Sequence, residues 1–276
     1  PMPALRIALL ADIHSNLLAL EAVRRDLRLH APDAVYLVGD QVNRCPWPNE
    51  VVEVVTQEGW PAIHGNHDLI VRTLLTPELI QPFDDRPRFR CLWWSAEVMR
   101  AANMAVLRGW PAEFAIDLPP GPPIRLLHGR PGNAFLGIFA ETPDEKLAAI
   151  LEPVAEPFVV VGHTHRPLDR TLSMPAGMTP AGVRRVLNPG SVGMPYNEDP
   201  RAQYLLLDLV RQGGGWTWQP TFRQLVYDWD ALRPAFERSG MMAATGASGE
   251  LHLRTALSGH AYSSDFGYWL KDQPRH

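Results

Sequence analysis

Short apolar runs that end in polar turns recur through the first part of the chain, and segments with helical spacing follow them. The run at residues 5–11 ends at Asp12 and His14, and apolar positions spaced as on one helix face follow it. A short apolar run bounded by turn residues is typical of a buried strand, whereas apolar positions three and four residues apart are typical of a helix. The pattern predicts strands at residues 5–11, 34–38, 61–64, 124–127 and 158–161, and helices at 17–29, 49–56, just after 68 and at 92–107.

The pattern of apolar positions in the second part of the chain predicts mostly strands. Apolar or alternating segments at 168–172, 184–187, 204–209 and 216–225 are separated by turns rich in Pro and Gly. Two later segments, 229–238 and 249–258, have helical spacing, and the tail from residue 259 has no clear period. We expect one α+β unit over residues 1–228 and a helical extension over residues 229–276 that packs on the same domain.

Composition and charge restrict the classes of protein to consider. Of 276 residues, 46% are hydrophobic and 20% charged, and no apolar run approaches the roughly 18–20 residues that span a bilayer. The net charge of −4 provides no overall positive field for a nucleic-acid backbone. The first residues lack the charged and apolar regions of a signal peptide, so we expect a cytoplasmic protein with neither a membrane nor a nucleic-acid partner. Cys45 and Cys91 have no metal-site spacing, which favours free thiols, and the oligomeric state stays open.

Histidines, carboxylates and an amide gather at the carboxyl ends of the predicted strands. They are Asp12, His14, Asp40, Asn66, His67, His128, His163 and His165. Open α/β sheets place their ligand sites at these ends, so we expect the side chains to share one site. With His67 set aside, four imidazoles, two carboxylates and an amide form a ligand set that suits Mn, Fe, Co, Ni or Zn. Seven ligands are too many for one such ion but suit two ions that share a carboxylate, the usual arrangement for attack at phosphorus.

The order of these motifs resembles the calcineurin-like metallophosphoesterase superfamily, and most closely its small bacterial and archaeal phosphodiesterases. The motifs are Asp-x-His, Gly-Asp, Gly-Asn-His-Asp, His-Gly and Gly-His-Thr-His. Each is weak alone, but five in this order behind strands are specific. The resemblance, over roughly residues 5–210, implies an α+β fold, a four-layer α/β/β/α sandwich of two mixed β-sheets flanked by helices. The catalytic domain would then occupy residues 1–228.

The resemblance also implies a role for each polar residue. One metal ion would be bound by Asp12, His14, Asp40 and His165, and a second by Asp40, Asn66, His128 and His163. Asp40 is then the bridging ligand, in keeping with the two oxygens and the charge of a carboxylate. In the family the residue at His67 faces the substrate and aids departure of the leaving alkoxide, so we assign His67 and Asp40 to catalysis. We expect the neighbouring Asp68 to support the ligands or to cap a helix.

Arg44 and Asn66 are the candidate substrate-binding residues. The segment around Arg44 resembles serine/threonine protein phosphatases and diadenosine tetraphosphatases, in which an arginine at this place grips phosphate. A planar guanidinium suits two-point recognition of a phosphoryl group, and the alternative is an ordinary surface charge. Asn43 stands where the protein phosphatases have aspartate and Cys45 where they have glycine, so the likeness to that branch is incomplete. Tyr196 replaces a basic residue that is frequent in phosphodiesterase relatives.

These observations favour a dinuclear-metal hydrolase of small phosphoesters or nucleotides, with attack by a metal-bridging hydroxide. We expect a phosphodiesterase with manganese, and Fe, Ni, Co or Zn as the other metals. The alternatives are a phosphomonoesterase or dinucleoside-polyphosphate hydrolase, which Arg44 favours, and a non-enzymatic scaffold with the same fold. A scaffold has no reason to keep all seven ligands.

Five aromatic residues have two interpretations, a cap over the site or part of the core. They are Trp93, Trp94, Trp110, Phe135 and Phe139. We favour the core, because large apolar side chains are most often buried.

Overall fold

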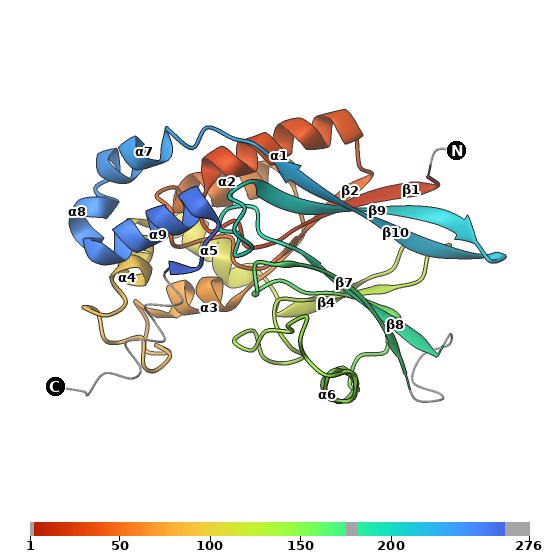
Figure 1. Cartoon of the computed structure of the whole chain (residues 1–276). Helices are drawn as coiled ribbons and strands as arrows, with labels where there is room; N and C mark the ends of the chain where they lie inside the picture. Colours follow the sequence, from red (N-terminus) through yellow and green to blue (C-terminus); the bar gives the residue numbers. More distant parts are fainter. Residues whose placement is uncertain (1–2, 175–181, 263–276) are drawn as a thin grey trace.

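The computed structural model describes residues 3–174 and 182–262. Strands and helices alternate in the first part of the chain, and strands dominate the second part (Figure 1). The strands are β1 (Leu5–Leu10), β2 (Ala34–Val38), β3 (Ala62–Ile63), β4 (Glu113–Ile116), β5 (Ile124–Leu127), β6 (Phe158–Val160), β7 (Pro167–Ser173), β8 (Val183–Pro189), β9 (Ala202–Gln212) and β10 (Gly215–Leu225). The helices are α1 (Leu17–His30), α2 (Pro48–Glu58), α3 (Asn66–Thr73), α4 (Arg90–Val98), α5 (Ala101–Gly109), α6 (Asp144–Ile150), α7 (Leu232–Arg238), α8 (Met241–Thr245) and α9 (Ala247–Ser258).

Among the described residues, the strands form two mixed five-stranded sheets. The order is β10-β9-β1-β2-β3 in the first sheet and β4-β5-β6-β8-β7 in the second. Neighbours β1, β2 and β3 run parallel, as do β5, β6 and β8, whereas β4, β7, β9 and β10 pair antiparallel. Each sheet therefore brings the carboxyl ends of three parallel strands to one edge.

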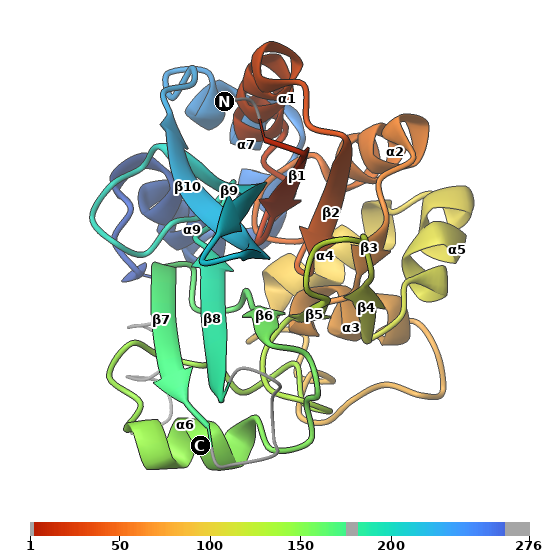
Figure 2. The same ribbon diagram turned by 90° about the vertical axis from the view of Figure 1, so that its right-hand side faces the viewer.

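The two sheets pack face to face through an apolar layer. Alternate residues of β1 point to opposite faces: Ile7 and Leu9 belong to the cluster between the sheets, and Ala8 and Leu10 to the cluster under the helices. Trp218 of β10 is fully buried between the sheets, and its indole N–H donates to the Pro122 carbonyl beside the second sheet (2.8 Å). Figure 2 shows α1 and α2 outside the first sheet and α6 outside the second. This confirms the expected α+β sandwich of two mixed sheets flanked by helices.

The helices after β10 pack on the outer face of the first sheet. Leu232 and Phe236 of α7 and Leu253 of α9 are fully buried in the same apolar cluster as Val23 of α1 and Val55 of α2. Within the described residues, no helix is both long and apolar enough to cross a membrane. The C-terminal helices thus complete the core of the first sheet.

Residues 92–107 do not form the single helix that their spacing predicts. Helix α4 ends at Val98 and α5 begins at Ala101, with Met99 in an extended conformation between them. The Asn49 side chain of α2 lies in this break, where its Nδ2 donates to the Val98 carbonyl and its Oδ1 accepts from the Arg100 N–H, both at 2.8 Å. The break between the two helices is therefore stabilised by one side chain, which forms hydrogen bonds with the backbone carbonyl and N–H on either side of it. Three further elements, β4, α6 and α8, were not predicted either.

A buried carboxylate joins the turn after β2 to the start of α3. Asp68 Oδ2 accepts from the backbone N–H groups of Asp40 (2.8 Å) and Gly65 (2.9 Å), and Oδ1 accepts from that of Val42 (3.0 Å). Asp68 is fully buried, and burial together with the nearby Asp40 charge raises the pKa of Asp68 to about 7. The expected helix-capping role is confirmed, and the same carboxylate fixes the position of Asp40.

Asp68→Asn tests this bond network without a change in side-chain size. The new amide group turns an N–H toward backbone donors, so we expect the free energy of unfolding to fall by about 2 kcal/mol. Urea denaturation followed by circular dichroism measures the change. Asp169→Asn is the matched control, because Asp169 is exposed and its ion pair with Arg185 is of the surface kind that contributes at most about 1 kcal/mol. Equal losses in the two variants would contradict the role given to Asp68.

Candidate metal centre

The loops after β1 and β2 lie against each other through backbone hydrogen bonds. The N–H groups of Asp12 and His14 donate to the carbonyls of Gly39 (3.0 Å) and Asp40 (2.9 Å). Asp12, His14 and Asp40 all have positive φ angles, between 50° and 58°. These left-handed conformations turn three side chains toward one point at the edge of the sheet.

The first predicted ligand group is assembled as the sequence suggests. One ligand atom from each of Asp12, His14, Asp40 and His165 lies within 4.8 Å of the other three, and all four residues are buried. His14 Nε2 lies 3.1 Å from His165 Nε2, and His165 Nε2 lies 3.4 Å from Asp12 Oδ1. Two nitrogens bound to one ion at roughly 2.1 Å and at right angles are about 3 Å apart, so this spacing fits a shared cation.

The second predicted group lies on the other side of Asp40. Asn66 Oδ1 is 2.9 Å from His163 Nδ1 and 3.1 Å from His128 Nε2. His128 Nε2 is also 3.3 Å from Asp40 Oδ2. Asn66, His128 and Asp40 are buried, and His163 is partly exposed. The structure thus brings all seven predicted ligands together in two groups that meet at Asp40.

Hydrogen bonds behind the ligands orient two of the imidazoles. His128 Nδ1 donates to the Val38 carbonyl (2.8 Å), and His165 Nδ1 donates to the Met194 carbonyl. A ring that donates through Nδ1 presents the lone pair of Nε2, which is the form that binds metal. Both Nε2 atoms point into the cluster, so the donor chemistry fits divalent ions.

The pKa shifts within the cluster also fit a site for divalent cations. Burial, with a further contribution from the Asp40 charge, raises the pKa of Asp12, and burial with the nearby Arg44 lowers the pKa of His14. Burial alone would lower the pKa of His128, but the Asp40 charge raises it to about 9. Carboxylates and imidazoles buried this close together shift each other's pKa values, because their charges are not solvated by water. Divalent cations between them would compensate the carboxylate charges and accept the imidazole lone pairs at the same time.

His67 lies at the open side of the cluster between two hydrogen-bond donors. Asn43 Nδ2 is 2.7 Å from His67 Nδ1, and Arg44 Nη2 is 3.1 Å from His67 Nε2. A neutral imidazole has only one acceptor nitrogen, so the two bonds compete. Ser95 Oγ donates to Asn43 Oδ1 (3.2 Å) and holds that amide in place. Burial, with Arg44 beside it, lowers the pKa of His67 to about 3.

Tyr196 and Ser95 contact residues of the predicted site, although neither has a predicted role there. The Tyr196 ring stacks on the candidate ligand His165, with ring centroids 4.1 Å apart, and its hydroxyl accepts from Arg44. Ser95 lies on α4 and is fully buried. The position of Tyr196 after the last metal motif is a sequence signal for a site residue, whereas no local sequence pattern marks Ser95.

The turn after β8 supports the loops of both sheets. Asn188 Nδ2 donates to the Gly162 carbonyl (2.8 Å), and Ser191 Oγ donates to the Asp12 carbonyl (2.7 Å). Both side chains are fully buried. This turn therefore positions ligand residues without contributing a ligand of its own.

The expectation that all five aromatic residues belong to the core is wrong for two of them. Trp94 is buried, and Trp93 and Trp110 are partly buried against core clusters. Phe135 and Phe139 are 37% and 45% exposed, because the loop after β5 turns them outward. Cys45 and Cys91 are buried free thiols, as expected.

Comparisons with known proteins agree with this geometry. The chain is 27% identical to the uncharacterized protein MJ0912 of Methanocaldococcus jannaschii over 210 residues, which cover 73% of this chain and 82% of that protein. The crystal structure of a metallophosphoesterase from Sphaerobacter thermophilus covers 92% of this chain and 99% of its own, with 26% sequence identity and a TM-score of 0.67. A hypothetical protein, PH1004 from Pyrococcus horikoshii OT3, has the same fold, with 21% identity, a TM-score of 0.71 and coverage of 92% and 98%.

The family comparison covers most of the chain. Residues 5–212 match the calcineurin-like phosphoesterase superfamily domain. That span contains both sheets except β10, and every residue of the candidate metal centre. The chain belongs to the calcineurin-like phosphoesterase superfamily.

Proposed function

We propose that this protein hydrolyses phosphoesters at a centre of two divalent transition-metal ions. The observation that carries the proposal is the position of Asp40 Oδ2, which lies 3.6 Å from His14 Nε2 and 3.3 Å from His128 Nε2. One carboxylate oxygen thus faces a histidine of each ligand group, as a bridging ligand does. Asp12, His14, Asp40 and His165 would hold one ion, and Asp40, Asn66, His128 and His163 the other.

Such ions, when bound, activate water and neutralise the charge on phosphoryl oxygens. The chain's own residues position the substrate. Arg44 offers a guanidinium beside His67, and Asn66, the residue before His67, is the second candidate contact for the phosphoryl group. A phosphoryl oxygen that accepts from Arg44 replaces the contact between Arg44 and His67.

His67 is proposed to protonate the leaving alkoxide. Burial and the Arg44 charge hold the pKa of His67 near 3 in the free protein, so the ring would take up its proton when a bound phosphoryl group offsets that charge. Its backbone N–H donates to Asp40 Oδ1 (2.8 Å), so the ring is fixed relative to the bridging carboxylate. Asn43 accepts from Ser95 and contacts His67 Nδ1, which leaves Nε2 as the ring atom that faces Arg44 and incoming substrate. A poor leaving group needs a proton as its bond to phosphorus breaks.

We place phosphodiesters first among the substrates, because the motif set is most like that of the small phosphodiesterases. Arg44 supports the second candidate, a phosphomonoesterase or dinucleoside-polyphosphate hydrolase, since a guanidinium suits a more highly charged phosphoryl group. Rates on bis-p-nitrophenyl phosphate and on p-nitrophenyl phosphate, with manganese added, discriminate between the two. If the protein hydrolyses neither ester with Mn, Fe, Co, Ni or Zn, the proposal is wrong and a non-enzymatic scaffold is favoured.

Asp40→Asn should reduce metal content more than His14→Ala does. The substitution removes charge from both proposed ions, whereas His14 contacts only one group. Elemental analysis of the purified variants measures metal per chain, with His30→Ala as the control because His30 lies on the surface of α1. About one ion per chain in the fully active protein would contradict the two-ion proposal.

Arg44→Ala should lower kcat/KM by about tenfold or more while metal content stays unchanged. The expected loss reflects a charge-assisted hydrogen bond to phosphate, worth roughly 1.5–3 kcal/mol. Arg211→Ala is the matched control, since Arg211 is an exposed arginine of β9 that lies over the Trp216 ring and contacts no residue of the candidate metal centre in the described structure. If kcat/KM does not change, Arg44 is an ordinary surface charge.

His67→Ala should slow alkyl phosphoesters by about 10²–10⁴-fold, the usual contribution of a general acid. Esters with a nitrophenolate leaving group should lose less, because that group departs without a proton. Parallel assays on an alkyl and an aryl ester, with metal content measured in the same samples, test the role. Loss of a metal ion, or equal slowing of both esters, would show that His67 is a ligand or an electrostatic contact instead.

A further inference from the structure

Three large apolar side chains are exposed on the loop between β5 and α6. Phe135, Leu136 and Phe139 are 37%, 46% and 45% exposed. The loop starts directly after the candidate ligand His128 at the end of β5. A cluster of exposed apolar groups beside a catalytic centre is typical of a ligand-binding surface.

The loop packs directly against His163 of the second ligand group. A Cβ added to Gly137 would lie 3.0 Å from His163 Cδ2, 2.9 Å from Thr164 Cγ2 and 3.2 Å from Phe139 Cε2. The Phe139 ring edge and the His163 ring are therefore close neighbours across Gly137. At the other end, the loop folds back so that the Leu136 carbonyl would be 2.7 Å from a Cβ on Gly129, the residue after His128.

The loop is internally ordered, so the exposed side chains are held in place. Arg130 and Asn133 exchange two backbone hydrogen bonds of 2.9 Å, and Asn133 Oδ1 accepts from the Phe135 N–H (2.9 Å). Ile138, between the exposed residues, is buried in the core beneath the second sheet. Phe135 stacks on Phe83, with ring centroids 6.3 Å apart and an angle of 23°. An apolar surface that is already ordered loses little conformational entropy when a ligand covers it.

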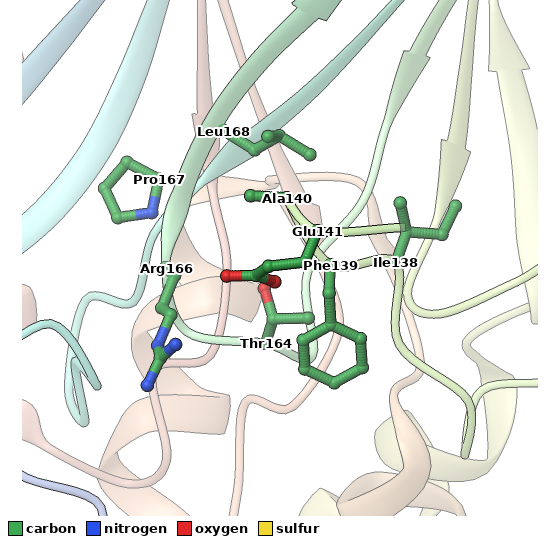
Figure 3. Close-up of a pocket in the computed structure, with 8 residues that line it drawn as sticks. All are labelled: Ile138, Phe139, Ala140, Glu141, Thr164, Arg166, Pro167 and Leu168. Carbon is green, nitrogen blue, oxygen red and sulfur yellow. The ribbon is translucent and has the colours of Figure 1, made fainter. Parts of the chain in front are cut away.

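Polar groups flank Phe139 on the side of the ligand histidines. Figure 3 shows the Phe139 ring next to Thr164, with Glu141 and Arg166 at the same small cavity. That cavity of about 30 Å³ holds no more than one or two water molecules, so a larger group has to lie on the open face of Phe139. A planar aromatic group with polar edges matches an aromatic ring surrounded by such groups.

We propose that Phe139, flanked by Phe135 and Leu136, binds the nucleobase of a nucleotide substrate whose phosphoryl group lies at the metal centre. This inference rests on the proposed phosphoester hydrolysis and specifies its substrate class. Stacking of a base on an aromatic side chain tolerates any base, because each base presents a flat face. The surface adjoins His163, so a base and a phosphate of one nucleotide can occupy the two places together.

The test compares substrates that differ only in the base. Phe139→Ser should raise the KM for 2′,3′-cyclic AMP about tenfold, the scale of one base stacking contact, with little change in kcat. The KM for ribose 2,3-cyclic phosphate should not change, and Phe139→Tyr should restore the KM for the nucleotide. Leu29→Ser is the matched control, because Leu29 is an apolar residue of α1 that is 82% exposed.

Calorimetric binding of AMP gives a second measurement that does not depend on turnover. We expect Phe139→Ser to weaken AMP binding by about the same factor and to leave ribose 5-phosphate binding unchanged. Equal effects on ligands with and without a base, or no effect on either, would overturn the inference while phosphoesterase activity stands. A wild-type protein that binds AMP through Phe139 but hydrolyses no phosphoester would overturn the proposed function alone. If Phe139→Ser instead dissociates an oligomer with KM unchanged, the surface joins copies of the chain and the inference is wrong.

Discussion

The buried carboxylate of Asp68 determines where Asp40, the proposed bridging ligand, lies. It accepts from backbone N–H groups on both sides of the site, those of Asp40 and Val42 after β2 and that of Gly65 after β3. Asp40 in turn accepts from the His67 N–H and faces histidines of both ligand groups. A shift of Asp68 would therefore move the Asp40 carboxylate, the candidate acid His67 and the start of α3 together. Because the three bonds to Asp68 are buried, water cannot replace a lost one at low cost.

Backbone strain is concentrated in the same loops. Left-handed φ angles occur at Asp12, His14, Asp40, His163 and His165, and none of these residues is glycine. Such conformations each cost on the order of 1–3 kcal/mol and persist only where the surroundings enforce them. Here the enforcing contacts are the loop-to-loop bonds from Asp12 and His14, and the bonds from Asn188 and Ser191 below. Metal binding would repay part of the strain, since the ligands are held ready in the folded state alone.

The sequence predicted the structure well where a residue pattern corresponds to only one kind of local structure. Buried parallel strands are short apolar runs, so the strands could be predicted, and so could the meeting of seven candidate ligands at the carboxyl ends of these strands. Contacts between distant segments could not be. The break between α4 and α5 depends on Asn49, about fifty residues earlier. The outward position of Phe139 depends on how the loop packs over Gly137, and an apolar residue gives no sign of that in the sequence.

The candidate centre exists only where the two sheets meet. The first sheet supplies Asp12, His14, Asp40 and Asn66, and the second supplies His128, His163 and His165. His128 Nδ1 donates to the Val38 carbonyl of β2, and the His163 N–H donates to Asp12 Oδ2 (3.1 Å), so hydrogen bonds at the site itself cross between the sheets. Neither ligand group is complete within one sheet. The apolar layer that includes Ile7, Leu9 and Trp218 therefore sets the geometry of the candidate centre as well as the stability of the fold, because any change in sheet packing alters the distance between the two halves of the centre.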